Sequence, residues 1–299
     1  MPIALVSNGV PVPGEGCNAL VPWWSFTKAV LSAASLTLVR DGALRLDDPV
    51  PEGPFTLRQL LRHEAGLADY GELADYHAAV ARGDAPWSAD EMLQRLDATR
   101  LRYAPGSAWR YSNVGYLYVA RLIERVTGLE LADALPRLSL APLGLSGVRL
   151  AQRPSDLAGV CGAHASGYDP GWVYHGLLVG PLSVAALWLD RLMEGHLLPD
   201  ALLREMQTAR RLGGEIPGRP WTSAGYALGL MQGEVDAGLT LCGHTGVGPG
   251  SVVAVYRCVA GTSTASCAVF GEGCDEGLAE REVVDRLSAA LTSGERGQP

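Results

Sequence analysis

One segment constrains the fold of this chain more than any other. Residues 25–40, SFTKAVLSAASLTLVR, are almost entirely apolar over about four helical turns. Asp41 and Gly42 follow, and glycine at that place commonly ends a helix. A helix that is apolar on every side has to be enclosed by other elements, because none of its faces can lie in water. The chain of 299 residues is long enough to build such a core around a central helix.

The two ends of the chain carry β patterns. Residues 3–6 and 10–12 flank Ser7-Asn8-Gly9, and Asn-Gly between apolar runs predicts a hairpin because the turn needs positive φ. From about residue 225, short β-rich runs separated by glycines predict an antiparallel meander: YALGLMQ, LTLCG, SVVAVYR and ASCAVFG. Residues 278–291 then predict an amphipathic helix. Both ends should therefore contribute to one sheet layer.

The middle of the chain has a helical pattern. Residues 55–140 are expected to be mostly helical, and residues 181–194 to form one more helix with a proline in its first turn. The predicted fold class is α+β: an antiparallel sheet flanked by helices, plus a mostly helical subdomain. We expect residues 1–50 and 170–299 to form the sheet domain with the central helix, residues 51–169 to form the helical domain, and the active site to lie between them.

Composition excludes several classes of function. The net charge is −8 and the basic residues form no dense run, so no nucleic-acid partner is expected. No apolar stretch is long enough for a membrane span, and the first residues, MPIALVSNGVPVPG, do not resemble a signal peptide, which predicts a cytoplasmic protein. The six cysteines form no CxxC pair and are expected to be small buried hydrophobes. The six histidines lack metal-site spacing, so neither a metal nor a cofactor is predicted.

A single lysine stands out in the central apolar run. Lys28 is the one lysine of the chain, whereas every other basic residue is an arginine, which does not lose its proton in proteins. Burial would lower the pKa of Lys28 and make its amine a general base. Ser25 lies three residues earlier, on the same helical face, and could be the nucleophile that this base activates. The alternative interpretation is a lysine that extends along a helix flank into water.

Two further motifs contain polar groups suited to a substrate site. Tyr111-Ser112-Asn113 follows a Pro-Gly turn, and the tyrosine could relay a proton if neighbouring cations lowered its pKa. Gly243-His244-Thr245-Gly246 lies at the edge of a β run, where glycines let a substrate approach the strand and the Val247 N–H could face an oxyanion. Taken singly, the first could be a turn with an Asn cap and the second a glycine-rich hairpin.

The three motifs together, SxxK, YxN and HTG in this order, resemble the serine β-lactamase and penicillin-binding-protein superfamily, most closely its branch of class C β-lactamases, DD-peptidases and family VIII esterases. LVRDGALRLDDPV, FTLRQLLRHEAGL and PGSAWRYSNVGYLYVARLIERVTGLE extend the resemblance over residues 1–175 and 225–290. It implies roles for eight residues: acylation of Ser25, proton transfer by Lys28 and Tyr111, substrate binding by Asn113, His244, Thr245 and Gly246, and an oxyanion hole formed by the N–H groups of Ser25 and Val247.

The sequence also departs from the family pattern. His244 stands where most β-lactamases have lysine, and no arginine lies between Arg219 and Arg257. We therefore expect no obvious carboxylate clamp near this strand, which disfavours β-lactam or D-Ala-D-Ala substrates because both need one.

Four functions remain open at the level of sequence. The first is hydrolysis of a small ester or amide through an acyl-Ser25 intermediate. The second is transfer of that acyl group to an amine or alcohol, which depends on how well the pocket excludes water. The third is a true β-lactamase or DD-peptidase acting on a β-lactam-like substrate, and the last is a binding module without catalysis.

Overall fold

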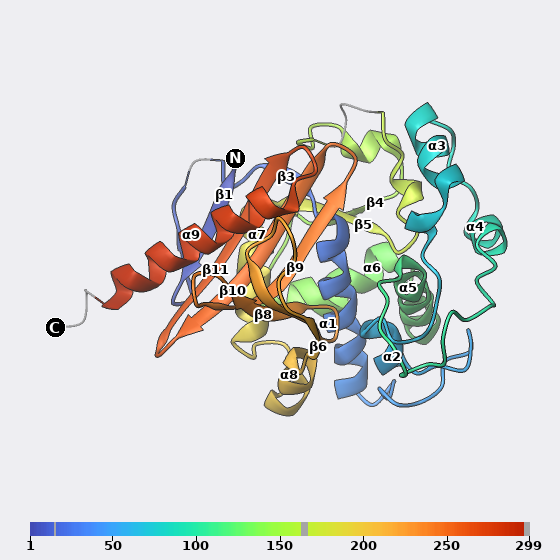
Figure 1. Ribbon diagram of the computed structural model, residues 1–299, viewed down its shortest axis with the longest axis horizontal. Coiled ribbons are helices and arrows are strands. Elements are labelled where there is room, and N and C mark those ends of the chain that lie inside the picture. Colours follow the sequence, from blue (N-terminus) through green and yellow to red (C-terminus); the bar gives the residue numbers. More distant parts are fainter. Residues whose placement is uncertain (15, 163–166, 296–299) are drawn as a thin grey trace.

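The computed structural model describes residues 1–14, 16–162 and 167–295 (Figure 1). Its strands are β1 (Ile3–Ser7), β2 (Val10–Val12), β3 (Leu20–Pro22), β4 (Arg149–Ala151), β5 (Leu177–Pro181), β6 (Arg210–Gly213), β7 (Trp221–Tyr226), β8 (Met231–Val235), β9 (Thr240–Gly248), β10 (Ser251–Ala260) and β11 (Ser263–Glu272). Its α-helices are α1 (Thr27–Arg40), α2 (Leu57–Leu61), α3 (Ala74–Arg82), α4 (Ala89–Arg95), α5 (Asn113–Thr127), α6 (Leu131–Leu135), α7 (Leu182–Met193), α8 (Asp200–Gln207) and α9 (Glu276–Glu295).

One large antiparallel sheet organises the molecule. Its eight strands lie in the order β2-β1-β11-β10-β9-β8-β7-β6, so the N-terminal hairpin joins the meander at its last strand. Ile3 pairs with Val269 and Ser7 with Ala265. A small second sheet has the order β3-β5-β4. The α+β class and the contribution of both chain ends to one sheet are confirmed.

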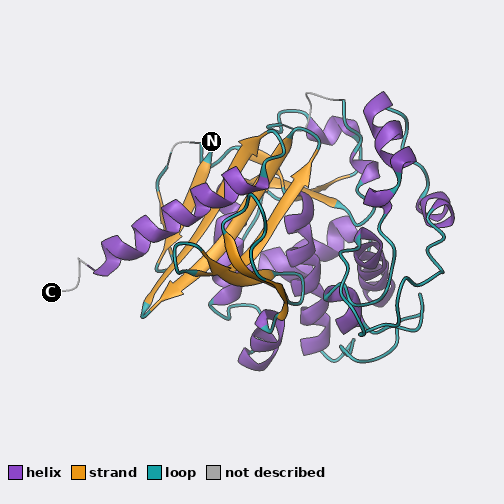
Figure 2. Ribbon diagram, in the orientation of Figure 1, coloured by secondary structure: helices purple, strands orange, loops and turns teal. Residues whose placement is uncertain are grey.

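Helices cover both faces of the large sheet (Figure 2). Helix α9 packs on β10 and β11, and its Val283 and Leu287 join an apolar cluster with inward residues of those strands. Helix α7 packs on the opposite face against β1, β10 and β11. The alternation of the strands thus gives the sheet two apolar faces, each of which a helix removes from water.

The central helix is buried as expected. In α1 every residue from Thr27 to Leu38 is buried, and the helix packs against α5 and strand β9. The helix starts later than predicted, because residues Trp24–Phe26 form a separate 3-10 turn, η1. Trp24 adopts a φ of +41°, which an α-helix does not allow. Ser25 therefore lies in a turn that leads into the helix.

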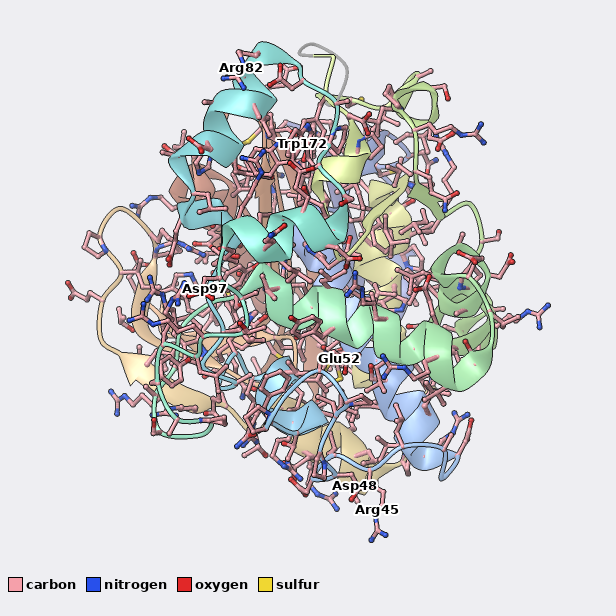
Figure 3. All side chains as sticks on the ribbon, turned by 90° about the vertical axis from the view of Figure 1, so that its right-hand side faces the viewer. Arg45, Asp48, Glu52, Arg82, Asp97 and Trp172 are labelled. Atoms are coloured by element: carbon pink, nitrogen blue, oxygen red, sulfur yellow. The ribbon has the colours of Figure 1, made fainter. Side chains whose placement is uncertain are left out.

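Helices α2 to α6 lie on the side of α1 away from the large sheet (Figures 1 and 3). In Figure 3, Arg82 projects outward from α3, whereas Trp172 is buried. Thr56 caps α2 by accepting a hydrogen bond from the Gln59 backbone, and Ser112 caps α5 in the same way. Helix is less abundant here than predicted, because a long connection without helix joins α4 to α5. The division into two domains stays a prediction.

Other details of the sequence prediction were wrong. Pro181 precedes α7 as its N-cap instead of occupying its first turn, and α9 is longer than the predicted helix. Cys258 and Cys267 are buried, but Cys274 is exposed and does not behave as a core residue. In the described part of the chain, no helix is both long and apolar enough to cross a membrane.

Candidate active site

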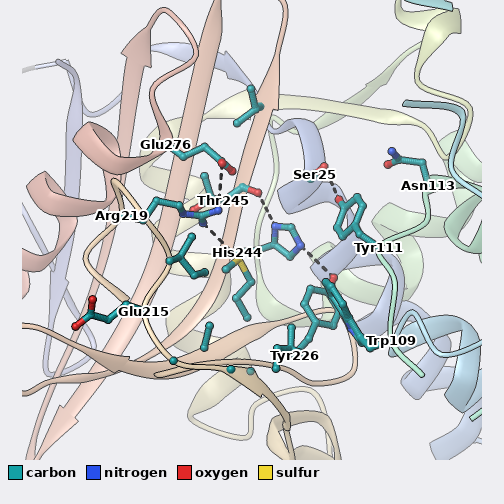
Figure 4. Close-up of a pocket in the computed structure, with 18 residues that line it drawn as sticks. Ser25, Trp109, Tyr111, Asn113, Glu215, Arg219, Tyr226, His244, Thr245 and Glu276 are labelled. Atoms are coloured by element: carbon teal, nitrogen blue, oxygen red, sulfur yellow. Dashed lines mark hydrogen bonds and ion pairs between the residues drawn. The ribbon is translucent and has the colours of Figure 1, made fainter. Parts of the chain in front are cut away.

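The hydroxyl group of Ser25 lies at the centre of the predicted site. Its Oγ has two polar neighbours, Lys28 Nζ at 3.1 Å and Tyr111 Oη at 2.9 Å. Lys28 comes from the first turn of α1. Tyr111 comes from the loop that precedes α5, and Figure 4 shows it beside Ser25. The structure therefore brings together the three residues that the sequence suggests for catalysis.

Lys28 is completely buried. Desolvation lowers the pKa of its amine from 10.5 to about 7, against the opposing charge of Asp69. An amine with this pKa is partly unprotonated at neutral pH. Because it lies within hydrogen-bond distance of the Ser25 hydroxyl, it can accept the serine proton.

A second neighbour of Lys28 was not predicted. His175 is buried, and its Nε2 lies 3.1 Å from Lys28 Nζ. Burial and the charge of Lys28 hold the pKa of His175 well below its usual range. The imidazole is therefore neutral and accepts a hydrogen bond from the lysine amine through Nε2. It supplies an acceptor without the negative charge that would raise the pKa of Lys28.

The pKa of Tyr111 shifts in the direction opposite to the one considered from the sequence. Burial raises the pKa of its phenol, so the proposed lowering by neighbouring cations is wrong. The phenol stays protonated and donates to Ser25 Oγ. Its ring lies against His63, with 4.3 Å between ring centroids, and His63 Nδ1 accepts a hydrogen bond from the Ser112 backbone. His63 thus anchors the loop that positions Tyr111.

Asn113 is held in place by a buried carboxylate. Its backbone N–H donates to Asp69 Oδ1 at 2.8 Å, and its side-chain Nδ2 donates to Asp69 Oδ2 at 3.3 Å. One of the two amide hydrogens is used in this way. The amide oxygen and the other N–H remain for a substrate.

His244 is neutral and has a fixed tautomer. Its Nδ1 lies 2.7 Å from the Thr245 carbonyl oxygen, which can only accept, so Nδ1 carries the hydrogen. Tyr226 Oη donates to Nε2 at 3.0 Å. Burial lowers the pKa of His244 to about 3. The strand therefore presents no positive charge at the position where most β-lactamases carry lysine.

Thr245 contacts a buried ionic network that includes an unexpected arginine. Its Oγ1 donates to Glu280 Oε1 at 2.5 Å. Arg219 binds the same Glu280 carboxylate with two nitrogens and donates to Glu276 through a third. The sequence placed no arginine near this strand, but Arg219 lines the cavity beside Thr245 (Figure 4). Its guanidinium is already paired with two carboxylates.

Glycines on β9 allow the strand to approach the nucleophile closely. A Cβ at Gly246 would lie 2.6 Å from the Ser25 nitrogen, and one at Gly248 would lie 2.4 Å from the Trp24 ring. Trp24 also donates its indole N–H to Ser251 Oγ at 3.0 Å, which ties the strained turn to the sheet. Gly246 of the third motif and Gly248 therefore permit the contact between β9 and η1.

Two cavities meet at Ser25. The larger has a volume of about 580 Å³ and the smaller about 400 Å³, both in the range of small-molecule sites. Ser25, Asn113 and Val247 line both cavities. The oxyanion hole formed by the N–H groups of Ser25 and Val247 stays a prediction.

Sequence reasoning missed several residues of the site. His175 and Asp69 carry no local signal, because each reaches the site only through the fold. Glu280 did carry one: on α9 it shares a helical face with the buried Val283 and Val284, so it is an acidic residue on an apolar stripe. Such a residue needs buried partners, which Arg219 and Thr245 provide.

Comparisons with known proteins agree with this geometry. The chain is 33% identical over 142 residues to esterase EstB of Burkholderia gladioli, covering 40% of this chain and 36% of the relative. It is 28% identical over 244 residues to a D-aminopeptidase of Cereibacter sphaeroides, covering 76% of this chain and 45% of the relative. The chain thus spans less than half the length of these relatives.

Solved structures show the same fold. A D-stereospecific amidohydrolase from Streptomyces sp. matches with a TM-score of 0.77 and 24% identity, covering 95% of this chain and 92% of the other. A D-amino acid amidase from Ochrobactrum anthropi SV3 matches with a TM-score of 0.77 and 22% identity, covering 97% and 94%.

The layered α+β architecture, with a serine turn between the large sheet and a helical region, is the fold of the β-lactamases and DD-peptidases. The sequence matches the Beta-lactamase family over residues 3–264, and the chain belongs to this family.

Proposed function

We propose that this protein is a serine hydrolase that cleaves a small ester or amide through an acyl-enzyme on Ser25. One observation carries the proposal: Lys28 Nζ and Tyr111 Oη both lie within hydrogen-bond distance of Ser25 Oγ, where two cavities meet. A base, an acid and a nucleophile are thus placed around one reacting atom. The esterase, D-aminopeptidase and amidase names among the relatives support the same reaction class.

The lysine and tyrosine divide the proton transfers of acylation. Neutral Lys28 accepts the Ser25 proton as Oγ attacks the substrate carbonyl carbon, and the carbonyl oxygen becomes an oxyanion facing the N–H groups of Ser25 and Val247. When the tetrahedral intermediate collapses, the bond to the leaving group breaks and Tyr111 Oη gives its proton to that group. The Lys28 ammonium then returns a proton to Tyr111. Water attacks the acyl-enzyme by the reverse proton route and releases the acid.

The charges of the site favour simple esters and amides over β-lactams and D-Ala-D-Ala peptides. A substrate carboxylate needs a free cation, but His244 is neutral and Arg219 is paired with Glu276 and Glu280. The Lys28 amine is hydrogen-bonded to the Ser25 hydroxyl and is therefore not free to bind a substrate carboxylate. This arrangement supports hydrolysis of a small ester or amide over the activity of a β-lactamase or DD-peptidase.

The mass of the intact protein tests the proposal. Brief incubation with a p-nitrophenyl ester should add the acyl mass or release product steadily, and Ser25→Ala should abolish both. Ser288→Ala, which removes a hydroxyl from α9, is the matched control and should retain full activity. Absence of reaction with any ester or amide would overturn the proposal. Turnover of a penicillin, or acyl transfer to an added amine without free acid, would replace it with the corresponding alternative.

A further inference from the structure

The two cavities differ in how they relate to the proton donor. Tyr111 lines the larger cavity together with His244 and Thr245, whereas His175 lines the smaller one. On the proposed function, on which this inference rests, Tyr111 protonates the leaving group. The leaving group therefore occupies the larger cavity, here named the leaving-group pocket, and the acyl group occupies the smaller one, named the acyl pocket.

The acyl pocket is mainly apolar and aromatic. Four aromatic residues line it: Trp24 from the turn η1, and Tyr70, Tyr76 and Tyr168 from other helices and loops. Val80 and Val173 add to the same surface. A wall of this kind favours an apolar acyl chain or ring, because burial of apolar area supplies the binding energy.

In the leaving-group pocket, Thr245 can only accept. Its single hydroxyl hydrogen is donated to Glu280 Oε1, and the Tyr256 hydroxyl lies 2.7 Å from the same Oγ1, so one lone pair remains to accept from a substrate donor such as an N–H group. Arg219 cannot reverse this preference, because its guanidinium already binds both oxygens of Glu280 and one oxygen of Glu276. Neutral His244 adds no charge.

The same wall carries an excess of negative charge. Glu215 and Glu276 line the pocket together with Arg219, and Arg219 is also paired with the buried carboxylate of Glu280. Glu276 uses one oxygen, Oε2, toward Arg219, and 36% of its side chain is exposed. Desolvation raises the pKa of Glu276, so a cation beside it would stabilise the ionised carboxylate.

We propose that the leaving-group pocket recognises a leaving group that carries a protonated amine and no carboxylate, attached to an apolar acyl group. The substrate class is thus an ester or amide of an apolar, ring-sized acid with an amino alcohol or a diamine. Glu276 binds the ammonium group by charge, and Thr245 accepts its N–H hydrogen bond. The charge is recognised on the leaving group and not on the acyl group.

A series of phenylacetate esters tests the proposal at neutral pH. The dimethylaminoethyl ester carries the cation, the isopentyl ester is its uncharged isostere, and the carboxyethyl ester carries a carboxylate. Each kcat/KM is divided by the rate of alkaline hydrolysis of the same ester, which removes differences in intrinsic reactivity. We expect the cationic ester to exceed the isopentyl ester by roughly fivefold or more, and the carboxyethyl ester to fall below it by a similar factor.

Substitution of the carboxylate identifies its source. Glu276→Gln should bring the ratio of cationic to isopentyl ester close to one, whereas Glu282→Gln should leave the ratio unchanged. Glu282 is the matched control because it lies on the same helix, also pairs with an arginine, Arg286, and changes the net charge equally. Added salt should reduce the preference in the wild-type protein, as expected for a partly exposed ion pair.

The outcomes separate this inference from the function on which it rests. Hydrolysis of the isopentyl ester that is lost in Ser25→Ala supports the proposed function alone. If that ester is hydrolysed but the three esters react equally, or the carboxyethyl ester reacts fastest, the inference is overturned and the function stands. A stronger preference for an aminomethyl group placed on the phenylacetyl ring would overturn the assignment of the two pockets. Absence of all ester hydrolysis overturns both.

Discussion

At the scale of single residues, the site depends on one amine kept neutral by burial. The charge of Asp69 raises the pKa of Lys28 by less than burial lowers it, and the acceptor beside the amine is the uncharged ring of His175. A carboxylate in the same place would hold the lysine protonated and prevent it from acting as a base.

The pKa of Lys28 predicts the pH dependence of acylation. Since the pKa is lowered to about 7, kcat/KM for a neutral ester should rise with pH up to about 7 and then level off. Below this value the amine is protonated, and the rate should fall about tenfold per pH unit. Initial rates across the pH range measure this limb. A limb governed by an ordinary lysine, well above pH 9, would contradict the burial argument.

Substitution of His175 should shift the acidic limb of the pH profile. His175→Phe removes the acceptor but keeps the site dry, so the Lys28 ammonium loses a hydrogen bond and its pKa falls further. We expect kcat to fall by up to about tenfold, and we expect the acidic limb of the pH profile to move to lower pH. His175→Gln, whose amide oxygen can accept from the amine, should restore the limb. An equal loss in both variants with an unchanged pH profile would mean that His175 serves packing alone.

At the scale of elements, the important contact is between strand β9 and the turn η1. Gly246→Ala places a methyl group 2.6 Å from the Ser25 nitrogen and 2.7 Å from the Trp23 carbonyl oxygen, so the strand and the turn must separate. A displacement of this size should lower kcat/KM by about a hundredfold. Gly14→Ala is the control, because its Cβ would meet only ordinary contact. Steady-state kinetics and the melting temperature measure both variants.

Much of the fold and the site was visible in the sequence, for physical reasons that apply to particular elements. The all-apolar run of α1 requires a central position, and alternating runs separated by glycines require an antiparallel sheet. Ser25 and Lys28 were found together because one helical turn joins them. His175 was missed because it reaches the amine from a segment 147 residues away, and the turn at Trp24 was missed because a strained φ leaves no mark in composition.

At the scale of the whole molecule, a buried ion pair joins helix α7 to the sheet. Arg257 on β10 donates to Asp190 at 2.8 Å, and Ser266 on β11 donates to the same carboxylate. Asp190→Ala removes the buried carboxylate and leaves Arg257 paired with the partly exposed Glu194, which should cost up to about 3 kcal/mol of the free energy of unfolding. Chemical denaturation measures this loss. Asp84→Ala breaks an exposed Arg–Asp pair with Arg82 and should change stability by less than about 1 kcal/mol.

The pairing of β1 with β11 affects how the chain folds while the ribosome synthesises it. Strand β1 cannot pair until β11 has been synthesised, and the site around Ser25 cannot form until Tyr111 and β9 have been synthesised. At typical rates of synthesis this delay is roughly ten to fifty seconds. During that time the largely apolar surface of α1 has no sheet to cover it. The nascent chain therefore exposes apolar surface of the kind that chaperones cover, and the site around Ser25 forms only after β9 has been synthesised.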